Sequence, residues 1–472
     1  MSTGSSDTIA QATDDDAAKT PVTNRKQPFP RGFLDTISTG WAERPESLPA
    51  ARPQAAYAAA RRDKVSAAFA GRRLVIPAGS LKQRSNDTDY PFRAHSAFAH
   101  LTGWAADAEP DSVLVFDPTD AGHDVTLYFR ERADRTTTEF YADATVGEFW
   151  IGPRPSLAGV AADLAIATDH LAAFTAGADD VALDDADLAR FVSELRLVKD
   201  EYEIAEMRRA VDITAQGFDD IIRALPEAAV HARGERVVEG VFHRRAREDG
   251  NGEGYDTIAA SGPHACYLHW TRNDGTVVPG DLILVDAGVE ADSLYTADIT
   301  RTLPVNGTFT EVQRKVYEAV REAADAAFAA AKNGVRFRTV HEAAMQVIAA
   351  RVAEWGLLPV TAEEALDADA GGQHRRYMVH GTSHHLGIDV HDCAQARREM
   401  YYDGILEPGM VFTIEPGLYF QIDDLTVPEE LRGIGVRIED DIVMTEDGPV
   451  NLSAGIPRTA DEVEAWIARV QA

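Results

Sequence analysis

Residues 279–288 read PGDLILVDAG, residues 408–417 read PGMVFTIEPG, and this repeat decides how we interpret the fold. In each stretch a Pro-Gly turn precedes an apolar run typical of a buried strand. A carboxylate follows the proline by seven residues, and a glycine stands two residues beyond the carboxylate. Pro-Gly turns before strands are common by themselves, but the shared carboxylate offset indicates two related hairpins. A pseudo-twofold relation between the hairpins would bring Asp286 and Glu415 to one centre.

Carboxylates at the ends of apolar strands need an explanation, because burying an unpaired charge costs several kcal/mol. Besides Asp286 and Glu415, Asp298 lies in TADITR twelve residues after Asp286, and Glu439 lies in VRIEDD. Each acid alone could be structural, and Arg437 could simply pair with Glu439, since alternate residues of a strand share a face. The four acids together, next to a histidine-rich segment, indicate a metal site.

The histidine-rich segment VHGTSHHLGIDVHD, residues 379–392, contains four histidines and two glycines. His380 and His384 are four residues apart, as on one face of a helix, but Gly381 and Gly387 predict a turn or irregular backbone instead. The segment therefore differs from the helical His-Glu-x-x-His zinc motif. A ligand set of carboxylates with one imidazole suits Mn²⁺ or Co²⁺, and Zn²⁺ is also compatible with it.

The composition narrows the class of protein. A chain of 472 residues is too long for one ordinary core, so we expect two domains. With 46 basic and 77 acidic residues the net charge is −31, which argues against nucleic acid or an anionic membrane as partner. Residues 1–30 lack a secretory apolar region and predict a disordered tail. Two cysteines far apart, Cys266 and Cys393, suit free thiols in the cytoplasm.

Local patterns predict the order of the elements. A small α/β domain over residues 31–195 is predicted from helices at 50–70 and 157–175 and strands at 73–79, 111–118, 124–131 and 180–184. A long helical pattern at 186–226 links the domains, and Pro226 is expected to end it. Over residues 196–472, apolar strands, hairpin-like turns and helices at 311–332 and 339–356 predict an α+β domain with antiparallel strands.

The sequence resembles the aminopeptidase P members of the metallopeptidase family with the pita-bread fold, whose relatives include prolidase, methionine aminopeptidase and creatinase. SNDTDYPFR at 85–93 and LTG at 101–103 resemble the family's amino-terminal domain, and the acids and histidines described above match its more specific carboxy-terminal motifs. The resemblance covers nearly the whole chain after residue 30. It implies an α+β pita-bread catalytic domain preceded by a smaller α/β domain.

The resemblance also implies five ligands for two divalent metal ions, with Mn²⁺ preferred over Co²⁺ and Zn²⁺. Asp298 and Glu439 would bridge the two ions, Asp286 would complete one site, and His384 with Glu415 would complete the other. Glu415 would also be the general base that takes a proton from a bridging water, which then attacks the scissile carbonyl.

Further residues match family positions that contact substrate. His391 and His269 would contact the substrate carbonyl and shuttle protons, and His380 would line the pocket for the proline side. Arg437 would support Glu439 or close a hydrogen-bond network behind it.

Three more features remain open at this point. Tyr255 and Trp270 are candidates for the aromatic wall of the proline pocket, with packing in the core as the alternative for each. His385 stands where relatives often carry an aromatic residue and is expected to line the pocket rather than bind metal. The interval from Asp286 to Asp298 is one residue longer than in some relatives, which predicts a looser hairpin turn.

The implied activity is release of the N-terminal residue from peptides with proline at the second position, by a cytoplasmic homodimer or homotetramer. An Xaa-Pro bond is a tertiary amide without an N–H, so a dedicated pocket is needed. Three alternatives stay open: a prolidase restricted to dipeptides, a metal-free relative with creatinase-like chemistry, and a non-catalytic interaction protein with this fold.

Overall fold

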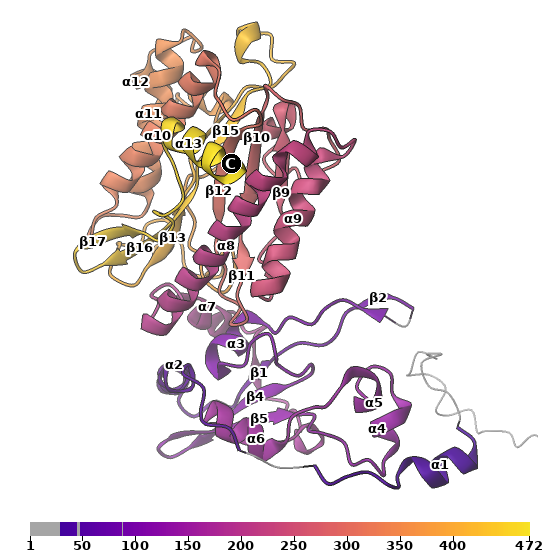
Figure 1. Cartoon of the computed structure of the whole chain (residues 1–472). Coiled ribbons are helices and arrows are strands. Elements are labelled where there is room, and N and C mark those ends of the chain that lie inside the picture. Colours follow the sequence, from indigo (N-terminus) through magenta and orange to yellow (C-terminus); the bar gives the residue numbers. More distant parts are fainter. Residues whose placement is uncertain (1–28, 45–47, 87) are drawn as a thin grey trace, which may run out of the picture.

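The structure is a computed structural model that describes residues 29–44, 48–86 and 88–472. The disordered tail predicted for residues 1–30 lies outside the described residues, apart from Phe29 and Pro30. Figure 1 shows a smaller N-terminal part below a larger C-terminal part, with α3 and α7 near the junction. Across the described ranges, no helix is both long enough and apolar enough to cross a bilayer.

A five-stranded sheet organises the N-terminal part, in the order β6-β5-β4-β1-β7. Its strands are β1 (Leu74–Pro77), β4 (Val113–Thr119), β5 (Gly122–Phe129), β6 (Ala167–His170) and β7 (Val181–Ala182). The surrounding elements are α1 (Arg31–Ile37), α2 (Ala55–Ala68), α3 (Ser96–Thr102), α4 (Thr138–Ala142), α5 (Glu148–Ile151), α6 (Leu157–Leu164) and the small hairpin β2 (Gln83–Ser85) with β3 (Thr88–Asp89). One hydrophobic cluster, which includes Leu74, Phe98 and Phe116, fills this part.

The helix predicted at 157–175 is wrong beyond Leu164. Ala165 has a φ of 52°, which ends α6, and residues 167–170 form β6, which pairs in parallel with β5. The alanine content favours a helix here, but pairing at the edge of the sheet outweighs that local preference. The remaining strands and the helix predicted for this part are found close to their expected positions.

The helical pattern predicted at 186–226 is two helices, α7 (Ala186–Glu194) and α8 (Glu201–Ala228). Asp200 begins α8 with a capping box, in which its side chain accepts from the Glu203 N–H and the Glu203 side chain accepts from the Asp200 N–H. Pro226 lies inside α8, so the prediction that it ends the helix is wrong. Proline cannot donate to the Ile222 carbonyl, which instead accepts a 3.0 Å hydrogen bond from Gln471 Nε2.

The C-terminal part combines short antiparallel sheets with long helices, which confirms the α+β class. Its strands are β8 (Gly252–Glu253), β9 (Ile258–Ser261), β10 (Leu282–Ala287), β11 (Val289–Glu290), β12 (Ile299–Pro304), β13 (Val411–Ile414), β14 (Gly417–Tyr419), β15 (Gly435–Arg437), β16 (Asp440–Thr445) and β17 (Gly448–Asn451). Its further helices are α9 (Gly234–Asp249), α10 (Glu311–Ala330), α11 (Arg338–Glu354), α12 (Ala362–Ala365) and α13 (Ala460–Gln471).

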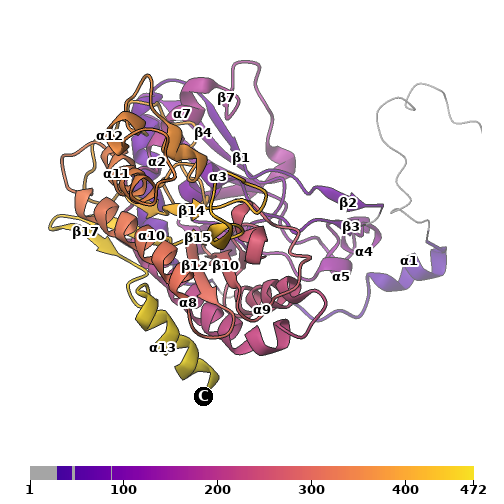
Figure 2. The same ribbon diagram turned by 90° about the horizontal axis from the view of Figure 1, so that it is seen from above.

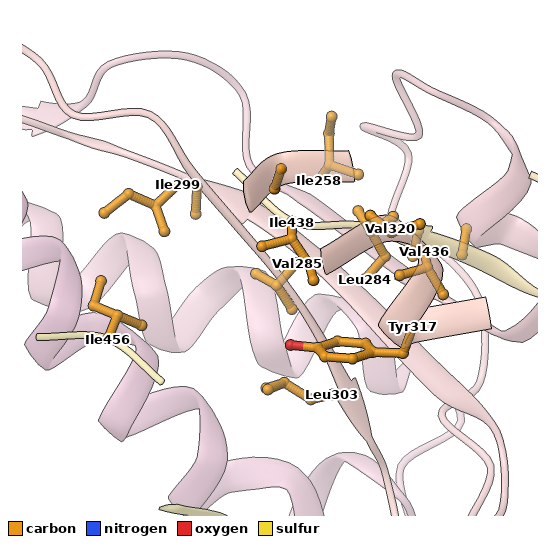
Figure 3. Packing of buried hydrophobic residues seen from close by; sticks show 14 of the residues in the cluster. Ile258, Leu284, Val285, Ile299, Leu303, Tyr317, Val320, Val436, Ile438 and Ile456 are labelled. Atoms are coloured by element: carbon orange, nitrogen blue, oxygen red, sulfur yellow. The ribbon is translucent and has the colours of Figure 1, made fainter. Parts of the chain in front are cut away.

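The helices cover one side of these sheets. Helix α8 packs on α9, and α10 packs on α11; seen from above, α8, α9 and α10 lie beside β10 and β12 (Figure 2). Figure 3 shows the core between them, where Leu284 and Val285 of β10 meet Tyr317 and Val320 of α10 and Ile438.

Candidate metal centre

The first hairpin places two of the predicted acids. Strand β10 pairs antiparallel with β12, so that Asp286 lies opposite Thr300, and Asp298 directly precedes β12. Gly288 makes this arrangement possible, because a Cβ at that position would lie 1.7 Å from the carbonyl oxygen of Ala297. The turn between Asp286 and Asp298 contains Leu294 with a φ of 68°.

The second hairpin places the other two acids. Glu415 directly follows β13, and Glu439 lies between β15 and β16. Gly417, the counterpart of Gly288 in the repeat, is also closely approached, since a Cβ there would lie 2.3 Å from Tyr419 Oη. The shared glycine therefore has the same use in both stretches: it lets a neighbouring group come close behind the carboxylate.

All five residues that were matched to metal ligands line one cavity of about 600 Å³. Ligand atoms of Asp298, His384 and Glu439 lie within 4.8 Å of one another. His384 Nε2 is 3.2 Å from Asp298 Oδ2 and 3.7 Å from Glu415 Oε1. Asp286 and Glu415, the two acids of the sequence repeat, face the same space, as the repeat predicted.

Arg437 lies behind the centre and holds Asp286 rather than Glu439. Its Nη2 donates to Asp286 Oδ2 at 2.5 Å, its Nη1 to Tyr419 Oη at 3.1 Å and its Nε to Thr300 Oγ1 at 3.1 Å. Thr300 Oγ1 in turn donates to Glu439 Oε2 at 2.7 Å. Arg437 thus reaches Glu439 only through Thr300, so of the two roles considered, it closes a network behind the acids.

Tyr255 joins the centre as a partner of carboxylates. Its hydroxyl lies 2.6 Å from Asp286 Oδ1 and 2.5 Å from Asp298 Oδ1. A phenol has one proton, so it donates to one of these acids at a time. Tyr255 lines the cavity, whereas Trp270 and His385 do not.

The electrostatics of the centre reflect carboxylates crowded in a buried space. Burial raises the pKa of Glu415 to about 7, with Asp298 and Asp286 adding to the rise. Burial and the neighbouring carboxylates also raise the pKa of Asp298 and, strongly, that of Glu439. Burial alone would lower the pKa of His384, but the hydrogen bond to Asp298 and the charge of Glu415 raise it to about 9.

The charges and donor atoms in the cavity show whether the residues fit a pair of divalent ions. Four carboxylates share the space with only Arg437 and a protonated His384 as cations, so the site favours additional positive charge. Oxygen ligands with one imidazole nitrogen match the donor preferences of Mn²⁺, Co²⁺ and Zn²⁺. Binding of metal would require His384 to release its proton. The donor set therefore fits two divalent ions.

Three further histidines predicted to contact substrate also line the cavity: His269, His380 and His391. His380 Nε2 is 2.7 Å from Tyr419 Oη, and burial together with the charge of Arg437 lowers the pKa of His380 to about 3. The ring of His391 meets that of His384 edge to face, with centroids 4.3 Å apart.

Trp270 and His385 were both considered for the pocket, but neither lines the cavity. Trp270 stacks on His264 with ring centroids 3.9 Å apart and donates to Glu235 Oε2, so the packing alternative holds for it. His385 is fully buried between Phe337 and Tyr401, so the expectation that it lines the pocket is wrong. Its side chain faces away from the cavity because neighbouring residues of an extended segment point to opposite sides, and His384 occupies the cavity side.

The sequence interpretation missed Thr300 and Tyr419, whose hydroxyls join Arg437 to Glu439 and His380. The signal for Thr300 was present, since it lies two residues after Asp298 and alternate residues of a strand share a face. For Tyr419 the same spacing applies, four residues after Glu415 and two after Gly417.

Comparison with known proteins agrees with this geometry. Residues 205–446 match metallopeptidase family M24, and residues 58–177 match the aminopeptidase P N-terminal domain. The chain is 50% identical over 480 aligned positions to Xaa-Pro aminopeptidase 1 of Streptomyces coelicolor, with 96% of each protein covered. It is 52% identical over 456 positions to Xaa-Pro aminopeptidase 2 of that organism, with 92% of this chain and 95% of the relative covered.

The solved structures show the same fold. The low-pH form of Escherichia coli aminopeptidase P matches with a TM-score of 0.75 at 30% identity and covers 90% of this chain and 100% of its own. The family resemblance and the fold class expected from the sequence are thus confirmed. With a family match over just over half of its length and relatives aligned almost end to end, the chain belongs to metallopeptidase family M24.

Proposed function

We propose that this metallopeptidase releases the N-terminal residue from peptides whose second residue is proline. The observation that carries the proposal is the convergence of five ligand-type side chains on one cavity, with the ligand atoms of three of them within 4.8 Å. The relatives named Xaa-Pro aminopeptidase, at 50% and 52% identity, support the choice of substrate.

We assign the five side chains as ligands of two divalent metal ions. Asp298 and Glu439, whose ligand atoms lie within 4.8 Å of one another, would hold both ions. Asp286, fixed by Arg437 and Tyr255, would complete one site. His384 and Glu415, whose nearest atoms are 3.7 Å apart, would complete the other. When bound, the ions would supply Lewis acidity that lowers the pKa of water and polarises the scissile carbonyl.

The protein's own groups would move the protons. Glu415 lines the cavity without a close hydrogen-bond donor among the described residues, which leaves its carboxylate available as a general base. Glu415 would accept a proton from the attacking water and return it to the proline nitrogen, which leaves as a secondary amine. His269 and His391 would bind the carbonyl oxygen as negative charge develops on it.

The proline side of the substrate would lie against His380. Its lowered pKa keeps this imidazole neutral at neutral pH, and its hydrogen bond to Tyr419 fixes the ring. A neutral, fixed ring can pack on pyrrolidine without demanding the N–H that proline lacks. Leu268 and Val390 add apolar surface to the same cavity.

Room for a longer peptide favours an aminopeptidase over a dipeptidase. A second cavity of about 290 Å³ shares Tyr401 and Tyr402 with the first and continues to Arg398. A peptide that extends beyond proline could leave the centre along this path. A prolidase, which accepts only dipeptides, has no use for such space.

Hydrolysis of Ala-Pro, Ala-Pro-Ala and Ala-Ala-Ala, measured after reconstitution with Mn²⁺, Co²⁺ or Zn²⁺, tests the proposal. We expect rapid release of alanine from Ala-Pro-Ala, little hydrolysis of Ala-Ala-Ala, and loss of activity on chelation. Cleavage of Ala-Pro alone would indicate a prolidase. Full activity after exhaustive chelation would support metal-free chemistry, and no hydrolysis with any metal would support a non-catalytic protein.

Several finer assignments belong to the same proposal. We propose Mn²⁺ as the native metal, a homodimer or homotetramer in the cytoplasm, and neither nucleic acid nor membrane as partner. The net charge of −31 supports the last point. We also propose a domain boundary between residues 195 and 196, supported by the break between α7 and α8 and by separate hydrophobic clusters on its two sides.

A further inference from the structure

We propose that a clamp of ion pairs, formed by Arg93, Arg196 and Lys199 with Asp389 and Asp392, positions His391 toward the metal centre. The clamp residues Arg93, Arg196 and Lys199 all lie outside the segment that matches family M24, residues 205–446. The inference rests on the proposed function, in which His391 binds the substrate carbonyl. It assigns a positioning role to residues that precede the segment matched to family M24.

The inner half of the clamp is centred on Asp392, the residue after His391. Arg196 Nε donates to Asp392 Oδ1 at 2.9 Å, and Lys199 Nζ donates to Asp392 Oδ2 at 3.2 Å. All three side chains are buried. Burial alone would raise the pKa of Asp392, but Arg196 and Lys199 lower it to about 2, so the carboxylate is charged at neutral pH.

The outer half of the clamp holds the chain on the other side of His391. Arg93 Nη2 donates to the Ile388 carbonyl at 2.7 Å, and its Nη1 lies 3.5 Å from Asp389 Oδ1. Ser96 Oγ donates to Asp389 at 2.5 Å, and Arg196 Nη2 lies 3.6 Å from Asp389 Oδ2. The two residues before the Val390-His391 pair are therefore fixed by the N-terminal part.

The clamp is packed without spare space. A Cβ on Gly387 would lie 2.3 Å from Asp392 Oδ2 and 2.9 Å from Lys199 Cε. The backbone on both sides is also tied, because the Asp392 N–H donates to the His385 carbonyl and the Lys199 N–H donates to Gly409, both within 2.9 Å. The backbone of Asp392 and of Lys199 is thus held in place beside the ion pairs.

Simple adhesion between the two parts does not require the contacts of Arg93, the clamp residue that belongs to the N-terminal part. An apolar cluster that includes Ala99, Met207, Leu294, Leu386 and Ile388 already joins them. Buried ion pairs are often no more stabilising than apolar side chains of similar size, but they are directional and can select one arrangement. Both acids flank His391, so the arrangement selected here is that of the loop that presents this imidazole.

A double-mutant cycle tests the clamp. Lys199→Met keeps the length of the side chain and leaves Arg196 paired with Asp392. We expect Lys199→Met to lower kcat/KM for Ala-Pro-Ala about 10-fold, as for other residues that orient a group at a metal site. In a His391→Ala background the same substitution should change kcat/KM less than about twofold, because the imidazole it positions is gone. An equal loss in both backgrounds, or no loss in either, would overturn the clamp.

A second readout does not depend on activity. Hydrogen exchange in a peptide covering residues 386–393 should be faster in Lys199→Met and in the milder variant Arg93→Gln, with exchange at 411–419 unchanged. Unchanged exchange at 386–393 would refute the clamp, whether or not the unsubstituted protein is active. An inactive unsubstituted protein would refute only the proposed function. Asp180→Asn is the matched control: it breaks an ion pair with Arg73, 2.7 Å long, elsewhere in the N-terminal part, and should alter neither readout.

Discussion

At the scale of single residues, the centre is determined by which partner each acid has. Asp286 has the Arg437 guanidinium and Glu439 has the Thr300 hydroxyl. Glu415 has no hydrogen-bond donor this close; the neutral ring of His380 lies 3.5 Å away and the ring of His384 lies 3.7 Å away. Because no group in the described part of the chain donates a hydrogen bond to its carboxylate, Glu415 is the acid best suited to exchange a proton.

Replacement of this acid separates its two proposed uses. Glu415→Gln keeps the size of the side chain and one oxygen ligand but cannot accept a proton. We expect kcat for Ala-Pro-Ala to fall by at least about 100-fold with saturating Mn²⁺, the usual contribution of a general base. The thermal unfolding midpoint of the protein without added metal should not fall, because the substitution removes a buried carboxylate that has no close hydrogen-bond donor. A kcat near that of the unsubstituted enzyme would contradict the assignment.

Arg437 is expected to act through geometry rather than charge. Lysine retains the charge but has no planar fork, so Arg437→Lys cannot reach Asp286, Tyr419 and Thr300 together. We expect the affinity for metal, measured by titration with Mn²⁺, to fall about 10- to 100-fold. Arg376→Lys, in an exposed ion pair with Asp424, is a control that should leave the affinity unchanged. Unaltered affinity in Arg437→Lys would show that charge alone suffices.

At the scale of elements, the hairpin of β10 and β12 sets the spacing of two acids. Its register places Asp286 opposite Thr300, so that the hydroxyl that binds Glu439 lies beside the acid, and Asp298, two residues before Thr300, lines the cavity with Asp286. Gly288 lies between the strands where the Ala297 carbonyl comes closest. The spacing of the acids therefore depends on the absence of a side chain at one position.

Gly288→Ala tests this dependence. The added Cβ would meet the Ala297 carbonyl at 1.7 Å, and the clash can be relieved only if the hairpin opens. We expect a loss of about 1–3 kcal/mol in stability, as for other overpacked sites, and weaker metal binding by calorimetry. Gly240→Ala, on α9 with open space around its Cβ, should instead stabilise by about 0.5–1 kcal/mol. Normal metal binding in Gly288→Ala would contradict this account of the hairpin.

At the scale of the whole molecule, buried polar groups join the N-terminal part to the metallopeptidase part. One group centres on Glu203 of α8, which accepts a hydrogen bond from Tyr295 in the turn before Asp298 and pairs with Arg61 of α2 at 3.3 Å. His100 of α3 lies 3.3 Å from the same carboxylate. Burial and the charge of Arg61 lower the pKa of His100 to about 4.

This histidine predicts a dependence of stability on pH. In the unfolded chain His100 titrates near its ordinary value of about 6.5, so between pH 6.5 and 4 the unfolded state binds a proton that the folded state does not. Stability is therefore fully present above pH 6.5 and is lost as the pH falls toward 4. We expect His100→Gln to reduce the fall in thermal midpoint between pH 8 and 5 by at least about 2 °C. Parallel curves for the two proteins would exclude this contribution.

Much of the site could be predicted from local sequence, because its signals are local. Asp286 and Glu415 each end an apolar run, and two glycines among the histidines of 379–392 exclude a helix there; the structure agrees on both points. The long helices α10 and α11 were equally clear from their alanine-rich sequences. In each case a short stretch of chain carries enough information to fix its own conformation.

The partners of these side chains were decided only by the tertiary structure. The sequence left open whether Arg437 pairs with Glu439 and whether Trp270 lines the pocket, and it gave no sign that Gln471 would replace the hydrogen bond lost at Pro226. Each of these contacts joins residues brought together by strand register or helix packing. The sequence by itself thus determined which groups could bind metal, while tertiary packing decided which neighbour holds each of them, because register and packing depend on the chain as a whole.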